Sequence, residues 1–186
     1  MFENLLAGTG LKHRYLSDLG FPIPDPVEDG HTVEENALIK ARAYCLATGL
    51  PTLSDDAGLA IPALGGEPGV KARRWAGLLP DDVSDEDWLE FALGKIRPLP
   101  GNSVEFHIPF ARCLYLPDGR YFFQSETIPS FLVKTPRFPY PKGWPLSAIR
   151  VFPDGRHQLD VPDDDPMLER FFFKEGLVEL LKNLEA

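Results

Sequence analysis

The stretch DGHTVEENALIKARAYCLATGLPTLSDDAGLAIPALGGEPGVKARRWAG, from Asp29 to Gly77, decides the fold of this chain. It combines a capped amphipathic helix, a short strand with an Asp-Asp pair at its end, and a glycine-rich loop followed by basic residues. Its three carboxylates and two of its basic side chains are the first candidates for a functional site: Glu35, Asp55, Asp56, Lys40 and Arg74. Such a set suits a hard cation with phosphate oxygens around it.

The first part of this stretch predicts an amphipathic helix that begins after Thr32 and ends at Gly49. Thr32, with Glu35 three residues on, forms the capping-box pattern of a helix N-terminus. The predicted apolar stripe consists of Ala37, Leu38, Ala41, Cys45 and Leu46. Glu35 therefore has two interpretations that its local sequence leaves open, a helix cap or a metal ligand.

The second part predicts a short strand over residues 51–54 that ends at Asp55-Asp56, ahead of Gly58. Adjacent residues of a regular strand point to opposite faces, so both carboxylates can serve one site only where the strand breaks. The alternative is an Asx-type turn, which the same residues favour. The position at a strand end favours a ligand site, because ligands of α/β folds bind there.

Two further segments are candidates for phosphate contacts. Residues 2–7 predict a buried strand and residues 11–19 a helix, with a Gly-Thr-Gly turn between them. The free N–H groups of such a turn can bind an anion, which makes Thr9, Gly10 and Lys12 candidates, although a tight turn between strand and helix explains the same pattern. Arg74 follows the glycine-rich loop, where phosphate binding and a solvated basic turn are both open.

The remainder of the chain predicts a second half rich in β structure and a helical end. Ser84 caps a helix over residues 84–93, and two β runs, 102–116 and 120–128, flank a Pro-Asp-Gly hairpin turn. A late strand over 147–152 precedes a last helix that opens at Asp165-Pro166. We expect one domain that divides into two lobes, residues 1–95 with 145–186 and a β-rich lobe over 96–144.

Bulk composition limits the classes of function. The chain has 186 residues, a formal net charge of −9 and a pI near 4.9, which disfavours binding to nucleic acid. We also expect no membrane partner, because no apolar run approaches the length of about 20 residues that a membrane helix needs. The N-terminus lacks the basic and apolar regions of a signal peptide, so we expect a cytoplasmic protein.

Three motifs carry a resemblance to a known family. Residues 32–41, TVEENALIKA, match the pattern T-F-x-E-N-A-x-x-K-A with one change, and residues 54–59, SDDAGL, resemble D-D-S-G-L. Residues 66–77, GEPGVKARRWAG, resemble the loop G-x-P-G-V-x-S-A-R-Y-x-G. In this order and spacing the motifs resemble those of the inosine triphosphate pyrophosphatase family, house-cleaning enzymes that convert non-standard purine nucleoside triphosphates to the monophosphate and pyrophosphate.

The resemblance implies an α/β fold, an elongated mixed β-sheet flanked by helices around a central nucleotide-binding cleft, in a homodimer. It implies a nucleoside triphosphate as substrate and Mg²⁺ as cofactor, held by Glu35 and Asp55. Asp56 would orient or deprotonate the water that attacks the α-phosphorus, and Lys12 and Lys40 would bind phosphates. These roles agree with the chemistry of phosphoryl transfer, in which cations neutralise phosphate charge and a carboxylate positions the nucleophile.

The chain also departs from the family pattern at the positions that read the base. The first family motif is shortened and lacks its Asn, and an Arg of the family falls near Val104. The motif F-G-Y/W-D-P aligns with residues 142–146, which leaves Lys142 and Trp144 as base-side candidates, and the S-H-R motif falls at residues 171–173. We therefore expect an altered base preference. The alternatives are a degenerate member that only binds nucleotides and a structural homodimer subunit with Phe171–Phe173 at its interface.

Overall fold

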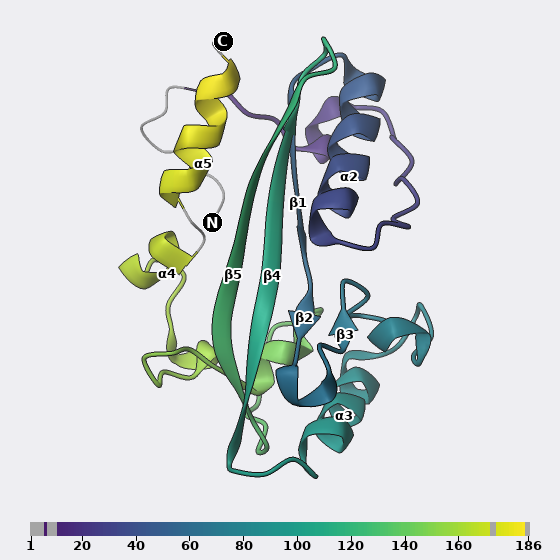
Figure 1. Cartoon of the computed structure of the whole chain (residues 1–186). Helices are drawn as coiled ribbons and strands as arrows, with labels where there is room; N and C mark the ends of the chain where they lie inside the picture. Colours follow the sequence, from purple (N-terminus) through teal and green to yellow (C-terminus); the bar gives the residue numbers. More distant parts are fainter. Residues whose placement is uncertain (1–5, 7–10, 172–173, 185–186) are drawn as a thin grey trace. The chain divides into compact units, whose positions relative to one another are not determined.

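The structure is a computed structural model that describes residues 6, 11–171 and 174–184 (Figure 1). The α-helices are α2 (Val33–Thr48), α3 (Asp85–Ile96), α4 (Pro166–Phe171) and α5 (Lys174–Leu181). The strands are β1 (Thr52–Ala57), β2 (Leu59–Ala60), β3 (Pro68–Gly69), β4 (Ser103–Tyr115), β5 (Tyr121–Val133) and β6 (Arg150–Val151). Short 3₁₀ helices are η1 (Leu16–Leu19), η2 (Pro62–Leu64), η3 (Trp75–Gly77), η4 (Pro145–Ala148), η5 (Gln158–Asp160) and η6 (Lys182–Leu184).

The six strands form one sheet in the order β3-β2-β4-β5-β6, with β1 paired to β4 beside this path. The pairings of β2 with β3 and of β5 with β6 are antiparallel, with Ala60 opposite Pro68 and Leu132 opposite Arg150. The predicted hairpin is confirmed, because β4 and β5 flank a turn that Gly119 N closes by donating to Leu116 O. With its helices, the sheet confirms the predicted α/β class.

The chain contains two compact units. Unit 1 consists of residues 1–56, 110–126 and 163–186, and unit 2 of residues 57–109 and 127–162. The long strands β4 and β5 each contribute residues to both units. The lobes expected from the sequence stay a prediction, and the two compact units follow other boundaries.

In unit 1, helix α2 lies along strand β1 (Figure 1). The helix begins and ends as predicted, because the hydroxyl of Thr32 accepts a hydrogen bond from Glu35 N and Gly49 adopts a left-handed conformation. Its buried face differs from the predicted stripe: Leu46 is 69% exposed, whereas Asn36 and Tyr44 are buried. A polar residue thus takes part in the face that packs on β1.

Helix α5 adds leucines to the core of unit 1. On α5 the buried side chains are Leu177, Leu180 and Leu181, and Leu180 packs with Leu114 of β4. These leucines recur at helical spacing, as one buried face of a helix requires. Its burial fixes α5 on the unit 1 part of the sheet.

The apolar core of unit 2 is centred on two tryptophans. Trp75 is fully buried and its ring lies 5.8 Å from that of Trp88 on α3. The buried residues of α3 recur at helical spacing: Trp88, Leu89, Ala92, Leu93 and Ile96. Ser84 caps this helix as predicted, accepting a hydrogen bond from Asp87 N. The core holds α3 against the sheet and so fixes the position of its first turn.

Two expectations about local structure are wrong. Strand β1 does not end at residue 54 but continues through both aspartates to Ala57. The helix expected over 11–19 is reduced to the single turn η1, because residues 11–18 are exposed and no packing supports a longer helix. The last helix begins at Pro166 as predicted, and its described parts are α4 and α5, on either side of residues 172–173. The strand expected over 2–7 falls largely outside the described residues, and Leu6, which is described, is helical.

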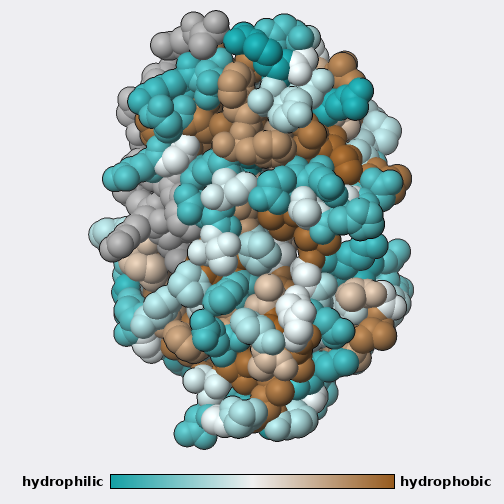
Figure 2. Space-filling view, in the orientation of Figure 1, coloured by the Kyte–Doolittle hydropathy of each residue, from teal (hydrophilic) through white to brown (hydrophobic). Residues whose placement is uncertain are grey.

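Polar and apolar side chains alternate over the face shown in Figure 2, with brown areas among the teal ones. The large apolar side chains that are most exposed in the described ranges include Val27, Leu46, Phe138 and Trp144. Among the described residues, none of the helices has the length and hydropathy to cross a bilayer.

Candidate functional site

The candidate functional site of unit 1 is built around a carboxylate and an ammonium group. Asp56, on β1, accepts a hydrogen bond from the ammonium of Lys40 on α2, with an Nζ–Oδ1 distance of 2.6 Å. The side chains are 12% and 17% exposed, so solvent screens this ion pair little. Asn36, one turn earlier on α2, donates to the other oxygen of Asp56 at 3.4 Å. The structure therefore brings together two predicted site residues, Lys40 and Asp56.

The pKa values of both groups are raised, for opposite reasons. Burial raises the pKa of Asp56 above its ordinary value, and the hydrogen bond and charge of Lys40 offset only part of that rise. Burial alone would lower the pKa of Lys40, but its hydrogen bonds with Asp56 and Glu28 outweigh this effect and raise it. Asp56 is thus a carboxylate of increased proton affinity beside an ammonium group that stays charged.

The segment ahead of α2 completes this cluster. Glu28 accepts a second hydrogen bond from Lys40 at 3.0 Å, and its side chain is 42% exposed. Gly30 N donates to the amide oxygen of Asn36 at 2.9 Å. A Cβ atom at residue 30 would lie 2.6 Å from this oxygen, so only glycine permits the close approach. Asn36 therefore joins the preceding segment to Asp56.

Glu35 serves as a helix cap in this structure. Its carboxylate accepts a hydrogen bond of 2.5 Å from His31 N, the residue before the N-cap, while its own N–H donates to Thr32. The residue is exposed. The cap and the metal-ligand interpretations are compatible, because a carboxylate has more acceptor positions than one hydrogen bond uses.

Asp55 lies on the other side of the strand from Asp56. Because β1 is regular at this point, adjacent side chains point to opposite faces, and Asp55 is exposed whereas Asp56 is half-buried. The charge of Asp55 acts on Arg112 of β4, which is 2% exposed. Burial lowers the pKa of Arg112, and Asp55 offsets part of that effect. Arg112 also donates to Gln124 of β5 at 3.2 Å.

The carboxylates of Glu35, Asp55 and Asp56 are chemically suitable ligands for a magnesium ion. They offer hard oxygen donors, but among residues 6, 11–171 and 174–184 no three His, Cys, Asp or Glu side chains converge into a metal cage. Magnesium does not need such a cage, since it commonly keeps several waters and uses one or two carboxylates together with substrate phosphates. The donors therefore suit an ion that is completed by a phosphate ligand.

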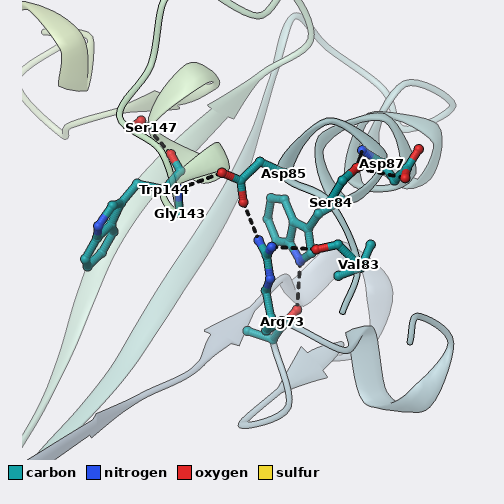
Figure 3. A network of polar contacts seen from close by, with 10 residues as sticks. Arg73, Val83, Ser84, Asp85, Asp87, Gly143, Trp144 and Ser147 are labelled. Atoms are coloured by element: carbon teal, nitrogen blue, oxygen red, sulfur yellow. Dashed lines mark hydrogen bonds and ion pairs between the residues drawn. The ribbon is translucent and has the colours of Figure 1, made fainter. Parts of the chain in front are cut away.

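In unit 2, Asp85 at the start of α3 joins two other segments (Figure 3). One of its oxygens accepts from Arg73 at 2.9 Å and the other from Gly143 N at 2.6 Å. The hydrogen bond from Gly143, with help from Arg73, lowers the pKa of Asp85. Arg73 also donates to Val83 O at 2.7 Å. The basic loop, α3 and the predicted base-side loop are thereby held together.

The remaining predicted site residues lie in exposed positions. Arg74 pairs with Asp81 at 2.5 Å, and its side chain is 53% exposed. Lys142 is exposed and Trp144 is 67% exposed, both just before η4. Lys12 is exposed in an extended segment. Thr9 and Gly10 lie outside the described residues.

Four charged or polar residues of these networks were not among the sequence candidates: Glu28, Asn36, Asp85 and Arg112. Asn36 stands inside the TVEENALIKA motif, so the motif itself was a signal. Arg112 is a charged residue within an apolar strand, which marks a buried polar position. Asp85 was visible only as a favourable residue in the first turn of a helix.

Fold and site together define an α/β protein with a half-buried aspartate–lysine pair between a strand and a capped helix. A sequence model of the Ham1 family matches residues 2–146. The chain belongs to the Ham1 family, and this confirms the family resemblance that the motifs of residues 32–77 carry.

Relatives of known name agree with this assignment. A dITP/XTP pyrophosphatase from Symbiobacterium thermophilum is 37% identical over 155 residues, which cover 83% of this chain and 74% of the relative. A dITP/XTP pyrophosphatase from Streptomyces coelicolor is 42% identical over 116 residues, or 62% of this chain. That second match spans 56% of the relative's length, somewhat more than half.

Solved structures show the same fold. A Ham1 protein from Coxiella burnetii superposes with a TM-score of 0.67 at 27% identity, over 90% of this chain and 89% of the other. A nucleoside-triphosphatase, or dITP/XTP pyrophosphatase, from Mycobacterium abscessus also has a TM-score of 0.67, at 26% identity. That alignment covers 100% of this chain and 91% of the other.

Proposed function

We propose that this protein is a Mg²⁺-dependent hydrolase that converts a nucleoside triphosphate to the monophosphate and pyrophosphate, with an altered base preference. The family and the names of its relatives support the reaction class. The observation that carries the proposal is the Asp56–Lys40 pair, a carboxylate of raised pKa held at 2.6 Å from an ammonium group.

Asp56 is the residue that would act on the water. Its raised pKa brings it closer to the range in which a general base works. It accepts the water proton as the water oxygen bonds to the α-phosphorus and the bond from this phosphorus to the bridging oxygen breaks. Pyrophosphate leaves with the electron pair of that bond.

Lys40 would both hold Asp56 and meet the phosphates. An ammonium group has three donors, and Asp56 and Glu28 accept from two of them. Glu28 is the more exposed partner, so an arriving phosphate displaces it more readily than it displaces Asp56. The charge of Lys40 then stabilises the negative charge of the transition state.

Glu35 and Asp55 are the residues proposed to hold Mg²⁺. When bound, the ion neutralises charge on the phosphate oxygens. Glu35 is positioned by its own helix cap, since the hydrogen bonds with His31 and Thr32 fix the first turn of α2. Because Asp55 and Asp56 point to opposite faces of β1, substitution of each aspartate separately tests which of them contributes to metal affinity.

Thr9, Gly10, Lys12 and Arg74 are proposed as further phosphate contacts, and Lys142 and Trp144 as base-side residues. A stacking indole accepts any base, because every base has an aromatic face. The absence of the family's base-reading Asp at residues 142–146 therefore supports a preference broader than that for 6-oxopurines. We also propose a homodimer, which light scattering after size-exclusion chromatography would detect.

The decisive experiment measures pyrophosphate release with Mg²⁺ from a panel of standard and deaminated nucleoside triphosphates. Turnover by the wild type that Asp56→Asn lacks, with circular dichroism unchanged, establishes the activity. The ranking of substrates then gives the base preference. No turnover from folded wild-type protein refutes the hydrolase and leaves a nucleotide-binding protein, which calorimetric titration with the same nucleotides would reveal.

A further inference from the structure

A set of hydrogen bonds in unit 2 converges on the loop that carries Trp144. Gly143 N donates to Asp85, and Trp144 N donates to Pro141 O at 3.0 Å. The carbonyl of Trp144 accepts from both the N–H and the hydroxyl of Ser147, at 3.0 and 2.6 Å. The backbone around Trp144 is therefore held on both sides of the residue (Figure 3).

The Trp144 side chain is not held in the same way. Its ring points away from Asp85 in Figure 3 and is 67% exposed. The other two tryptophans, Trp75 and Trp88, are at most 4% exposed. An indole left in water on an ordered backbone forgoes the free energy of burial, and aromatic side chains of this kind are enriched where a ligand covers them.

Asp85 is the residue that connects this loop to the core of unit 2. It stands on the first turn of α3, and the helix is fixed by the hydrogen bond of Ser84 with Asp87 and by the burial of Trp88. Its contact with Gly143 spans 58 positions of the sequence. Gly143 has a φ of +85°, so the loop needs a conformation that other residues rarely adopt. The carboxylate of Asp85 thus joins the loop backbone at Gly143 to helix α3.

Arg73 gives the carboxylate a defined orientation. Its guanidinium bridges Asp85 and Val83 O, which fixes the plane of the carboxylate so that the remaining oxygen faces Gly143. The neighbouring backbone is fixed too, because the indole N–H of Trp88 donates to Ala72 O at 3.0 Å. The loop before η4 and the basic loop after β3 are therefore ordered by the same group.

We infer that Asp85 is a positioning residue that holds the Trp144 loop in a binding-ready conformation and so sets the affinity for the nucleobase part of the substrate. The inference rests on the proposed function, in which Trp144 lies on the base side. Its physical basis is preorganisation: a loop that is ordered before binding loses less conformational entropy when the ligand arrives. Asp85 contributes no atom to the phosphate chemistry.

The test distinguishes an effect on binding of the nucleobase from an effect on binding of the phosphates. The variant Asp85→Ala should raise KM for the best nucleoside triphosphate about 3- to 10-fold, a part of the effect of losing a stacked base, while kcat changes less than about 2-fold. Inhibition by inorganic tripolyphosphate, which has no base, should stay unchanged. Asp85→Asn keeps an acceptor for Gly143 N and should recover part of the affinity. Glu86→Ala, which removes a neighbouring exposed charge from the same helical turn, is the control.

A measurement without turnover keeps this inference separate from the proposed function. Hydrogen–deuterium exchange of residues 141–147 should accelerate in Asp85→Ala and not in Glu86→Ala. Binding of the α,β-methylene analogue of inosine triphosphate should weaken in the same variant. If the wild type hydrolyses no nucleotide yet binds this analogue, the hydrolase fails and the binding comparison still decides the role of Asp85.

Four results would overturn the inference. Unchanged exchange in Asp85→Ala would show that the carboxylate does not order the loop. Faster exchange with an unchanged KM and unchanged analogue binding would show that loop order has no role in affinity. Equal weakening of the nucleotide and of tripolyphosphate, or no analogue binding by the wild type, would show that Asp85 does not act through the base.

Discussion

The polar cluster of unit 1 and the polar network of unit 2 use the same kinds of side chain in different ways. In unit 1 the side chains of the aspartate–lysine pair are only 12% and 17% exposed, and burial raises the pKa of Asp56. In unit 2 Asp85 accepts from a backbone N–H and a half-exposed arginine, and its pKa is lowered. The first arrangement suits proton transfer, and the second suits holding a loop.

The largest expected effect comes from removing Asp56, the proposed general base. Asp56→Asn should lower kcat about 10²- to 10⁴-fold, the usual contribution of a general base, with KM little changed. Asp85→Asn tests the contrast between the two units, because that variant should raise KM and leave kcat little changed. Steady-state pyrophosphate release measures both parameters, with Asp82→Asn as an exposed control. A loss of kcat in Asp85→Asn as large as that in Asp56→Asn would remove the distinction between the two regions.

Removing the ammonium group tests how far the unit 1 pair depends on mutual neutralisation. Lys40→Met should lower the free energy of unfolding by about 2–3 kcal/mol, somewhat less than the loss for a fully buried pair, because it leaves Asp56 half-buried without its cation. Urea unfolding followed by circular dichroism measures this loss. The acid limb of the pH–rate profile should also move to higher pH, since Lys40 lowers the pKa of Asp56. An acid limb at the same pH in both proteins would show that Lys40 does not change the pKa of Asp56.

The sign of the pH dependence of this pair follows from its two shifts. Lys40 has a folded pKa above its ordinary 10.5, so its stabilisation is fully present below pH 10.5 and is lost as the pH rises through the folded value. Asp56 acts in the opposite sense, because its raised folded pKa makes its ionisation destabilising as the pH rises through the acid range. The stability of wild type and Lys40→Met should therefore converge at strongly alkaline pH.

The helix caps of the two units offer a smaller and matched comparison. Thr32→Ala and Ser84→Ala each remove a hydroxyl that accepts from the N3 backbone, and each should cost about 1 kcal/mol of stability. Their effects on activity should differ. Thr32→Ala should raise the Mg²⁺ concentration for half-maximal rate, because Glu35 is the capped residue, whereas Ser84→Ala should raise KM through Asp85. Magnesium and substrate titrations of both variants decide this, and identical profiles would contradict it.

The smallest effect is expected at His157 of unit 2. Its Nδ1 accepts from Leu159 N and its Nε2 lies 3.2 Å from Ala148 O, which requires the neutral ring, and burial lowers its pKa. A lowered folded pKa means that stability is present above pH 6.5 and is lost as the pH falls through the folded value. Thermal unfolding between pH 7 and 5 should therefore show a small loss of stability that His157→Gln lacks.

Much of the fold could be predicted because its signals are local. The caps of α2 and α3, the hairpin turn and the leucines of α5 depend on residues within a few positions of one another. The errors occurred where packing over long distances decides. Leu46 is exposed and Asn36 is buried because the contact of α2 with β1 selects the buried face. Strand β1 continues to Ala57 because its pairing with β4 outweighs the turn preference of Asp55-Asp56.

In the candidate site, too, local signals could be predicted and long-range packing could not. The sequence by itself determined the family, the α/β class and the presence of Glu35, Lys40, Asp55 and Asp56 within one motif-bearing stretch. Only the tertiary structure decided that Asp56 rather than Asp55 pairs with Lys40, and that Asp85 holds Gly143. Motifs record which chemical groups are present, whereas the direction of a side chain and its distant partners depend on strand register and on how helices pack.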